Sequence, residues 1–549
     1  MHLSFSPEKA TISKAVFIGL CATAGARAAG LPIVDLGYEV HQAISYDRSL
    51  ETYNFTNIRY AAPPVGNLRF AAPAYPEVNR THVQRGSEAR ICPQAAPSWM
   101  EESMSSAVSY VTNGSITSLG SVLLDTRSNE DCLFLDVIAP RKFFNETGKK
   151  HSKKAPVLVW IYGGGYTSGS KSGQNSGSPN GLLQRGDSNF IYVTLNYRIG
   201  ALGFLSGPTL QRSGVANAGL WDQRFALEWI QRNIHLFGGD PDQVTVMGES
   251  AGGGSILHQI TAFGNSNGPV PFQQAILQSP AFTPGDFDAG DQENLLNEFL
   301  AYCNVSSLEE ARRLPSEIII QANAQQVTNS PIGSFTYRPV VDGVFVPDAP
   351  ATMMKQGRLD HGVSVMLGYN GNDGVIFSDF SLTNDTEYRN YVSGLLNLTP
   401  NQTDYLATSI YPPVSESSEY VDEISRAATT FQEAVIQCND IFLATAMGNQ
   451  SFNYVYDVFP SLHAMDLQAT FDISPSHQSS EFDSSIALQQ LITSFVLTGK
   501  PSSSSHGMLP AYGPNGMLSV INATTIYNER ESQASVGRCN RLYELMYSQ

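Results

Sequence analysis

The sequence predicts an α/β fold, in which one large and mostly parallel central sheet is flanked by helices. Two runs, Val157–Tyr162 and Phe190–Leu195, consist almost wholly of apolar, β-branched and aromatic residues. Such runs are typical of strands that are buried on both faces. Leu220–Phe237 instead mixes apolar residues with Asp, Gln, Arg and Glu, which favours a helix. Strands that alternate with helices in this way predict a parallel sheet with right-handed crossovers.

The other expected elements follow in order along the chain. Near the N-terminus, Phe55–Tyr60 is extended, and Ala61–Pro64 interrupts it because proline removes a donor and fixes the backbone. Later apolar runs are short and are separated by glycine-rich or polar turns. Beyond the first helix we expect a strand at Val244–Met247, a helix at Ser250–Thr261, and strands at Ala275–Gln278 and Val363–Leu367.

The composition fits a single large folded domain. Of the 549 residues, 42% are hydrophobic and only 15% are charged, which excludes an intrinsically disordered protein. The 46 glycines follow no three-residue period, which excludes collagen. The net charge of −17 disfavours nucleic acid as a partner, because its phosphates would be repelled. No internal repeat or long low-complexity linker divides the chain, so we expect one domain over residues 29–549.

The first 28 residues are typical of a secretory signal peptide. Lys9 and Lys14 precede the apolar run Ala15–Ala24, and Ala26–Ala28 has the A-x-A form of a processing site. A membrane helix needs about 20 apolar residues, so this shorter run favours a cleaved leader over a membrane anchor. An N-terminal core helix is the structural alternative. No other run is long enough for stable membrane insertion, and we expect a secreted, extracellular protein.

Sequons and cysteines agree with export. N-x-S/T sequons accept glycans in the secretory pathway, and an oxidising compartment permits disulfides. Beyond residue 28 the number of cysteines is odd, which leaves one thiol over. The sequons begin at Asn54, Asn79, Asn113, Asn145, Asn304, Asn384, Asn397, Asn401, Asn449 and Asn522, and the cysteines are Cys92, Cys132, Cys303, Cys438 and Cys539.

Gly248–Gly252 reads Gly-Glu-Ser-Ala-Gly and lies between an expected strand and an expected helix. In a G-x-S-x-G turn, glycines permit a sharp bend that presents the serine hydroxyl at the carboxyl end of the strand. A glycine-rich turn with an idle serine would give the same five letters. The strand–turn–helix setting favours the functional interpretation, so Ser250 is the candidate nucleophile.

A second glycine segment, Gly163–Gly165, directly follows the strand Val157–Tyr162. A lone run of three glycines is usually a flexible loop. Here it lies upstream of the serine turn, where unhindered backbone N–H groups can stabilise a developing oxyanion. The candidate donors of this oxyanion hole are the N–H groups of Gly164, Gly165 and Ala251.

Several segments resemble signatures of the type-B carboxylesterase/lipase family, which includes cholinesterases and secreted fungal lipases. The resemblance runs from Leu36 to the C-terminus. It implies the α/β-hydrolase fold, hydrolysis of carboxylic esters, and chemistry without a metal or cofactor. The matching segments are Phe237–Gly239 with Val244, Val246 and Gly248–Gly252; Glu130–Val137; Asn196–Arg198 with Gly203–Leu205; Pro63–Gly66 with Arg69 and Phe70; and Phe495–Pro501.

The acid of the catalytic triad follows the serine in such hydrolases, and the histidine comes last. Gly368–Gly374 resembles the family's acid loop and places Asp373 at the acid position, where the family most often has glutamate. Aspartate is one methylene shorter, so the loop must bring its carboxylate closer. An Asx-rich turn is the structural alternative, and Asp360 is a rival that no motif supports.

Three histidines lie downstream of Asp373. His463 begins a segment that resembles the family's H-x-x-[D/E] element, and it precedes Phe495 by 32 residues, about the family's spacing. His477 partly mimics the element, but its spacing to the acid is one residue too long and it lies too near Phe495. His506 is interpreted as an ordinary polar residue. We therefore expect His463 to take the serine proton while Asp373 orients its ring.

The resemblance also implies features around the triad. Glu249 and Ser279 are expected in a buried polar network behind the serine and histidine, although a purely structural role is equally compatible with the sequence. Relatives carry disulfides at positions that match four of the cysteines. The implied pairs are Cys92 with Cys132 and Cys438 with Cys539, and Cys303 is then the odd thiol.

The loop between Cys92 and Cys132 has an apolar helical face. In lipase-like relatives this loop is a lid and in others a fixed wall, and ordinary core packing would also explain the face. Cholinesterases carry a tryptophan in this loop for cationic substrates, but Trp99 lies near the wrong end, so we expect a neutral ester. The face consists of Met100, Met104, Ala107, Val108 and Val111.

The leading hypothesis is a secreted serine hydrolase that cleaves small-molecule or lipid esters through an acyl-enzyme on Ser250. A lipase that acts on long acyl chains, or an acyl transfer or lactone-forming step, would use the same intermediate. A non-catalytic binding protein is the alternative from another class. It is disfavoured because the serine, acid, histidine and glycine hole are all present.

Overall fold

The computed structural model describes residues 30–114, 127–173, 176–284, 287–448, 450–472 and 483–547. The expected leader, residues 1–28, lies outside the described residues. So do the sequon Asn449 and the alternative base His477.

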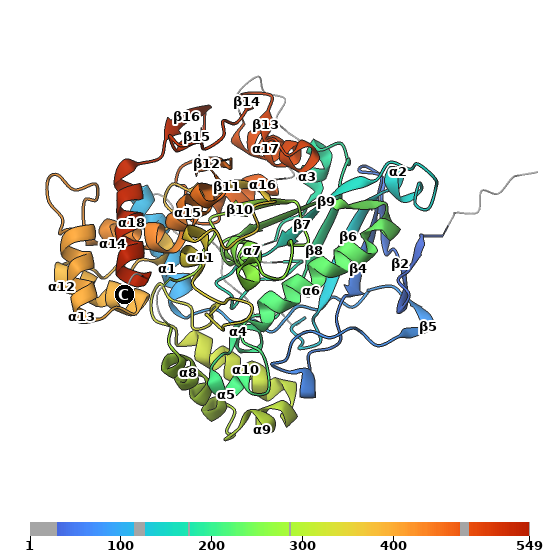
Figure 1. Ribbon diagram of the computed structural model, residues 1–549, viewed down its shortest axis with the longest axis horizontal. Coiled ribbons are helices and arrows are strands. Elements are labelled where there is room, and N and C mark those ends of the chain that lie inside the picture. The colour runs from blue at the N-terminus through green and yellow to red at the C-terminus, as the bar shows by residue number, and fades with distance from the viewer. Residues whose placement is uncertain are drawn as a thin grey trace, which may run out of the picture.

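An 11-stranded sheet runs through the centre of the molecule (Figure 1). Its strands are in the order β16-β15-β12-β11-β10-β9-β7-β8-β6-β4-β3, and the run from β15 to β8 is parallel. Antiparallel strands extend both edges, so the predicted mostly parallel sheet is confirmed. The bounds are β3 Ser45–Asp47, β4 Thr52–Arg59, β6 Phe134–Pro140, β7 Ala155–Ile161, β8 Ile191–Leu195, β9 Gly239–Glu249, β10 Gln274–Gln278, β11 Ser364–Asn370, β12 Phe452–Asp457, β15 Met517–Asn522 and β16 Ile526–Arg530.

Helices cover both faces of the sheet. In Figure 1, α6 (Ala218–Asn233) and α7 (Ala251–Ile260) lie on one side, and α3 (Asn180–Arg185) and α17 (Ser484–Thr498) lie on the other. The expected helix at Leu220–Phe237 is α6 followed by a 3-10 turn, η2. The left-handed backbone of Gly238 (φ 87°) ends that turn, as glycine commonly does.

The remaining elements surround this core. No helix among the described residues is long and apolar enough to cross a membrane. The helices are α1 Trp99–Thr112, α2 Arg141–Phe144, α4 Gly200–Phe204, α5 Pro208–Gln211, α8 Ala289–Tyr302, α9 Leu308–Arg313, α10 Ser316–Thr328, α11 Pro350–Lys355, α12 Asp385–Leu396, α13 Pro400–Tyr405, α14 Glu423–Phe431, α15 Cys438–Ala446, α16 Met465–Thr470 and α18 Gln533–Tyr547; the small strands are β1 Ile33–Asp35, β2 Glu39–Gln42, β5 Asn79–Gln84, β13 Ser502–Ser503 and β14 Gly507–Met508.

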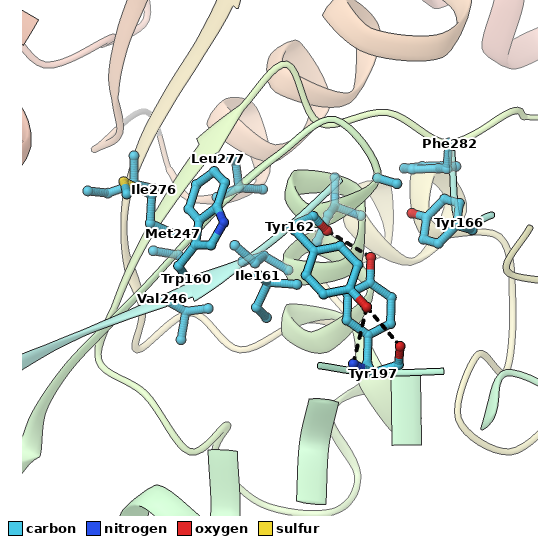
Figure 2. Packing of buried hydrophobic residues seen from close by; sticks show 14 of the residues in the cluster. Trp160, Ile161, Tyr162, Tyr166, Tyr197, Val246, Met247, Ile276, Leu277 and Phe282 are labelled. Carbon is cyan, nitrogen blue, oxygen red and sulfur yellow. Dashed lines mark hydrogen bonds between the residues drawn. The ribbon is translucent and has the colours of Figure 1, made fainter. Parts of the chain in front are cut away.

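The core is tightest where the central strands end. Every residue of β7 and β8 is buried. Just beyond them, the rings of Tyr162 and Tyr197 stack with centroids 4.4 Å apart, and each hydroxyl donates to the other residue's carbonyl (Figure 2). This pair joins the ends of two neighbouring strands, and it fixes the backbone from which the glycine segment after β7 departs.

Both expected disulfides are present, Cys92–Cys132 and Cys438–Cys539. Among the described residues Cys303 is free, and it is buried. The predicted helix between the first two cysteines is α1, and its Ala107 and Val108 are buried against other parts of the chain. Their partners are Val375, Ala428 and Leu462.

Candidate active site

Ser250 occupies the sharp turn between β9 and α7. Its backbone has φ 55° and ψ −124°, a strained region for a residue with a side chain, and such strain concentrates at functional sites. Three backbone hydrogen bonds hold it there. Its N–H donates to Gln278 at 2.9 Å, and its carbonyl accepts from Gly254 at 2.8 Å and Ala281 at 3.0 Å. A Cβ at Gly252 would lie 2.2 Å from the Ile161 carbonyl oxygen, so this turn requires glycine.

The glycine segment packs directly against the serine. A Cβ at Gly163 would lie 2.8 Å from the Ser250 Cβ. Gly164 and Gly165 have φ of 114° and 60°, and a Cβ at Gly165 would lie 2.2 Å from the Phe335 ring. Among the described residues, neither the Gly164 nor the Gly165 N–H donates a hydrogen bond to another group. Two backbone N–H groups that make no hydrogen bond with a described residue therefore lie next to the candidate nucleophile.

His463 and Asp373 are in direct contact. The Nδ1 of His463 is 2.6 Å from Oδ1 of Asp373, whose side chain is fully buried. The same carboxylate accepts hydrogen bonds from the Ser279 hydroxyl at 3.0 Å and from the Asn370 N–H at 2.8 Å. These donors fix the acid, and the acid fixes the ring orientation of His463.

A parallel β-bridge brings the two loops together. Asn372, one residue before Asp373, pairs with Leu462, one residue before His463. The Asn372 N–H donates to Ser461 at 2.8 Å. This extra pairing continues the alignment of β11 with β12 beyond the strand ends, and it explains how an aspartate reaches the histidine despite its shorter side chain.

The other edge of the imidazole faces the serine turn. The Nε2 of His463 is 3.3 Å from Oε1 of Glu249, the residue before Ser250. Within the described structure, this nitrogen makes no hydrogen bond. The ring therefore lies between the acid on one side and the serine turn on the other, with one nitrogen available to exchange a proton.

Sequence reasoning did not identify the polar residues that hold this arrangement. The Asn370 side-chain amide donates to Ser279 and Asp466, each at 3.2 Å. Gln278 donates to the other Asp466 oxygen at 2.9 Å. Asn370 lies in the loop already singled out for Asp373, and Asp466 is the acid of the H-x-x-D element, so both motifs contained the signal.

An aromatic wall lies beside the site, and no sequence pattern predicted it. Phe377 packs against His463 with ring centroids 5.1 Å apart. Trp99, from α1, contacts both Phe335 and Phe377, at 5.7 and 6.3 Å between centroids. Phe431 stacks on Phe377 at 4.2 Å. The site is therefore bordered by uncharged aromatic surface, and only 7% of Ser250 is exposed.

Asp360, the alternative acid, and His506, another downstream histidine, have other roles in the described structure. Asp360 accepts from the backbone N–H groups of Val270 and Gly362, each at 2.8 Å. His506 lies in the turn between β13 and β14, where its N–H donates to the Ser503 hydroxyl at 3.2 Å. Asp360 therefore joins its own turn to the segment at Val270, and His506 belongs to a local turn.

Comparison with known proteins identifies the family. Residues 40–534 match the model of the carboxylesterase family. The chain belongs to this family. It is 39% identical over 516 residues to "Carboxylesterase patB" of Penicillium expansum, covering 88% of this chain and 91% of that protein. It is 31% identical over 388 residues to a "Secreted lipase" of Arthroderma benhamiae, covering 68% and 72%.

The solved structures agree. Aspergillus niger EstA superposes with a TM-score of 0.78 at 25% identity, over 94% of this chain and 99% of that one. The expected resemblance and the α/β-hydrolase fold are thereby confirmed, and this carboxylesterase is a carboxylic ester hydrolase. Its secreted relatives and its two disulfides point to an extracellular protein.

The electrostatics of this carboxylesterase centre on buried carboxyl groups. Burial by itself lowers the pKa of His463, but the neighbouring carboxylates of Glu249 and Asp373 outweigh burial and raise it. Burial raises the pKa of Glu249, and it raises that of Asp466 to about 6. The carboxyl group of Glu249 and the imidazole of His463 therefore influence each other's protonation. Among the described residues, no group of three His, Cys, Asp or Glu is arranged to hold a metal ion.

Proposed function

We propose that this carboxylesterase cleaves neutral esters through an acyl-enzyme on Ser250. The observation that supports this most is the position of His463, whose Nδ1 contacts Asp373 at 2.6 Å while its Nε2 edge faces the serine turn. A histidine that is oriented by an acid and lies beside the turn of a strained serine is the arrangement that activates a hydroxyl nucleophile.

Each residue has one role in this reaction. His463 takes the proton of Ser250 as its oxygen attacks the ester carbonyl, and Asp373 stabilises the imidazolium that forms. The backbone N–H groups of Gly164, Gly165 and Ala251 donate to the oxyanion of the tetrahedral intermediate. His463 then gives its proton to the leaving alcohol, and water hydrolyses the acyl-enzyme by the same steps in reverse. Ser279 and Glu249 act on the acid and the base rather than on the substrate.

The border of the site favours an uncharged ester. Trp99, Phe335 and Phe377 bear no charge and surround His463 and the glycine segment. A cation on the substrate would have to lose its hydration against this surface. Hydrolysis rates for p-nitrophenyl esters of increasing acyl length, with and without an emulsified interface, distinguish a short-chain esterase from a lipase. A higher hydrolysis rate at the interface would identify the protein as a lipase in which α1 moves as a lid.

Covalent labelling tests the nucleophile. A fluorophosphonate is expected to add one adduct to the wild-type chain, and the modified peptide should contain Ser250. Ser250→Ala should remove both the adduct and the hydrolysis of p-nitrophenyl acetate while the fold persists. His463→Ala should abolish turnover, whereas His477→Ala should not. A reversed result for the two histidines would reassign the base, and the absence of any adduct would favour a non-catalytic binding protein.

Secretion and processing complete the proposal. We propose that residues 1–28 direct export and are removed, which leaves a domain over residues 29–549. N-terminal sequencing of the secreted protein should then give Ala29 as the first residue.

The sequons predict N-glycans on the secreted protein, so enzymatic removal of N-glycans should lower its mass. Among the sequons, Asn54 is the least suited, because its side-chain oxygen is buried within β4. Exposed sequons are Asn79, Asn113, Asn145, Asn304, Asn384, Asn397 and Asn401, and Asn522 is half-buried.

A further inference from the structure

A small pocket lies behind the serine turn, and none of the three triad residues lines it. The residues that line it include His258 of α7, Phe282, Phe287, Arg338 and Tyr547 of α18. Its volume is about 60 Å³, measured as the space open to the centre of a water molecule. A water needs about 10–15 Å³ on that measure, so the pocket accepts a group of about four to six non-hydrogen atoms.

Among the described residues that line this pocket, Arg338 is the only one with a charged side chain. Its guanidinium lies 4.6 Å from the centre of the Phe287 ring, and it makes no hydrogen bond or ion pair with any described residue. Burial lowers its pKa to about 10, so it remains a cation at neutral pH. The nearby carboxylate of Asp291 instead accepts from the Asn397 amide at 3.1 Å. The Arg338 side chain is only partly exposed, and a bound anion would compensate a positive charge that no described residue neutralises.

The rest of the lining is neutral and largely apolar. The Nδ1 of His258 is 2.7 Å from the Gly254 carbonyl, so it carries the ring proton. Burial lowers the pKa of this histidine to about 4, which leaves it uncharged at neutral pH. Its ring packs edge-on against Phe282 at 4.8 Å. The pocket therefore offers one positive charge and a short apolar wall, which suits a singly charged anion with a small hydrocarbon tail.

The pocket is connected to the nucleophile through the backbone. Phe282 follows Ala281, whose N–H donates to the Ser250 carbonyl at 3.0 Å. His258 lies on α7, the helix that begins directly after Ser250. A ligand that packs against Phe282 and His258 thus touches both segments that hold the strained serine turn.

We propose that this pocket binds a short-chain carboxylate, with the guanidinium of Arg338 on the carboxylate and the tail against the rings of Phe282 and His258. Planar arginine matches a carboxylate with two parallel hydrogen bonds. Carboxylates are also the acids that ester hydrolysis releases, so this site is placed to sense product. That last step rests on the ester hydrolase activity, whereas binding itself does not.

Ligand-observed NMR titration with sodium butyrate tests binding without catalysis, on the full chain carrying Ser250→Ala. Arg338→Gln should weaken butyrate binding by about tenfold or more, the effect of losing a charge-assisted hydrogen bond. Arg338→Lys should retain part of the affinity. Butyramide is the neutral isostere of butyrate. It should bind the Ser250→Ala chain as weakly as butyrate binds the same chain with Arg338→Gln added. Arg212→Gln, which removes an exposed arginine, is the matched control and should leave the affinity unchanged.

Two results would overturn the proposal. They are equal butyrate affinity in the Ser250→Ala parent and in the variant that also carries Arg338→Gln, and phosphate binding as tight as butyrate binding. In the active enzyme, butyrate should inhibit without competing with the ester, and Arg338→Gln should lose that inhibition while Ser250 labelling persists.

Discussion

Asn370 and Asp466 exchange hydrogen bonds across the candidate active site. The Asn370 side-chain amide nitrogen donates to Oδ1 of Asp466, and the Asp466 backbone N–H donates to the side-chain oxygen Oδ1 of Asn370, each at 3.2 Å. Asn370 ends the strand before Asp373, and Asp466 lies in the first turn of the helix after His463. This reciprocal pair therefore ties the acid loop to the base loop, in addition to the direct contact between the acid and the histidine.

Asn370→Ala should lower kcat by about tenfold or more, because both loops lose a shared support. The free energy of unfolding should fall by about 1–3 kcal/mol, since the buried Asp466 loses a donor. Urea unfolding and p-nitrophenyl acetate kinetics measure the two effects. Ser307→Ala, which removes the N-cap of α9, should cost about 1 kcal/mol with full activity. Equal kcat in Asn370→Ala and wild type would assign Asn370 a structural role only.

Glu249→Gln should extend activity to lower pH. A carboxylate 3.3 Å from Nε2 stabilises the imidazolium of His463, and the reaction requires the neutral imidazole. Removing that charge lowers the pKa of His463, so the acidic limb of kcat/KM should move down by about one to three pH units. Glu88→Gln, at a side chain that is 81% exposed, should leave the limb in place. An acidic limb that does not move in Glu249→Gln would show that the Glu249 carboxylate does not stabilise the imidazolium of His463.

Gly165→Ala should lower kcat by about 100-fold or more, the effect of losing an oxyanion donor. The added methyl would lie 2.2 Å from the Phe335 ring, and φ is 60° at this position, so the backbone must move. Gly394→Ala is the matched control, because a Cβ there meets nothing within 4 Å. That change within α12 should raise stability by about 0.5–1 kcal/mol with unchanged kcat. Full activity of Gly165→Ala would remove this glycine from the oxyanion hole.

The secreted protein should contain one thiol that reacts only after unfolding. Cys303 is buried, and burial raises its pKa to about 11, so the reactive thiolate is scarce at neutral pH. Titration with a disulfide reagent should detect no thiol in the native protein and one in denaturant. Two thiols in denaturant would indicate that Cys21, within the expected leader, is retained.

Removal of either disulfide should destabilise the protein, and the longer loop should cost more. The bridges separate residues 40 and 101 positions apart, for which chain entropy gives about 4 and about 5 kcal/mol. Alanine pairs at Cys92/Cys132 and at Cys438/Cys539 measure both losses by urea unfolding. A larger loss for the shorter loop would mean that native contacts around Cys92 outweigh chain entropy.

The central sheet and the two glycine turns can be predicted from the sequence alone. Continuous apolar runs identify β7 and β8, because strands covered on both faces need apolar side chains at every position. The serine and glycine turns lie at strand ends, where short-range sterics demand glycine. Motif resemblance added the family, the disulfide pairs and the identity of the acid and base.

Contacts between side chains that are distant in the sequence are visible only in the tertiary structure. His463 and Asp373 are 90 residues apart, and their contact depends on β11 lying beside β12 and on the bridge between Asn372 and Leu462. The aromatic wall gathers Trp99, Phe335 and Phe377 from three distant segments, and only the folded chain shows that no described residue pairs with Arg338. Local sequence patterns record periodicity along one element, whereas contacts of this kind arise when separate elements close against one another.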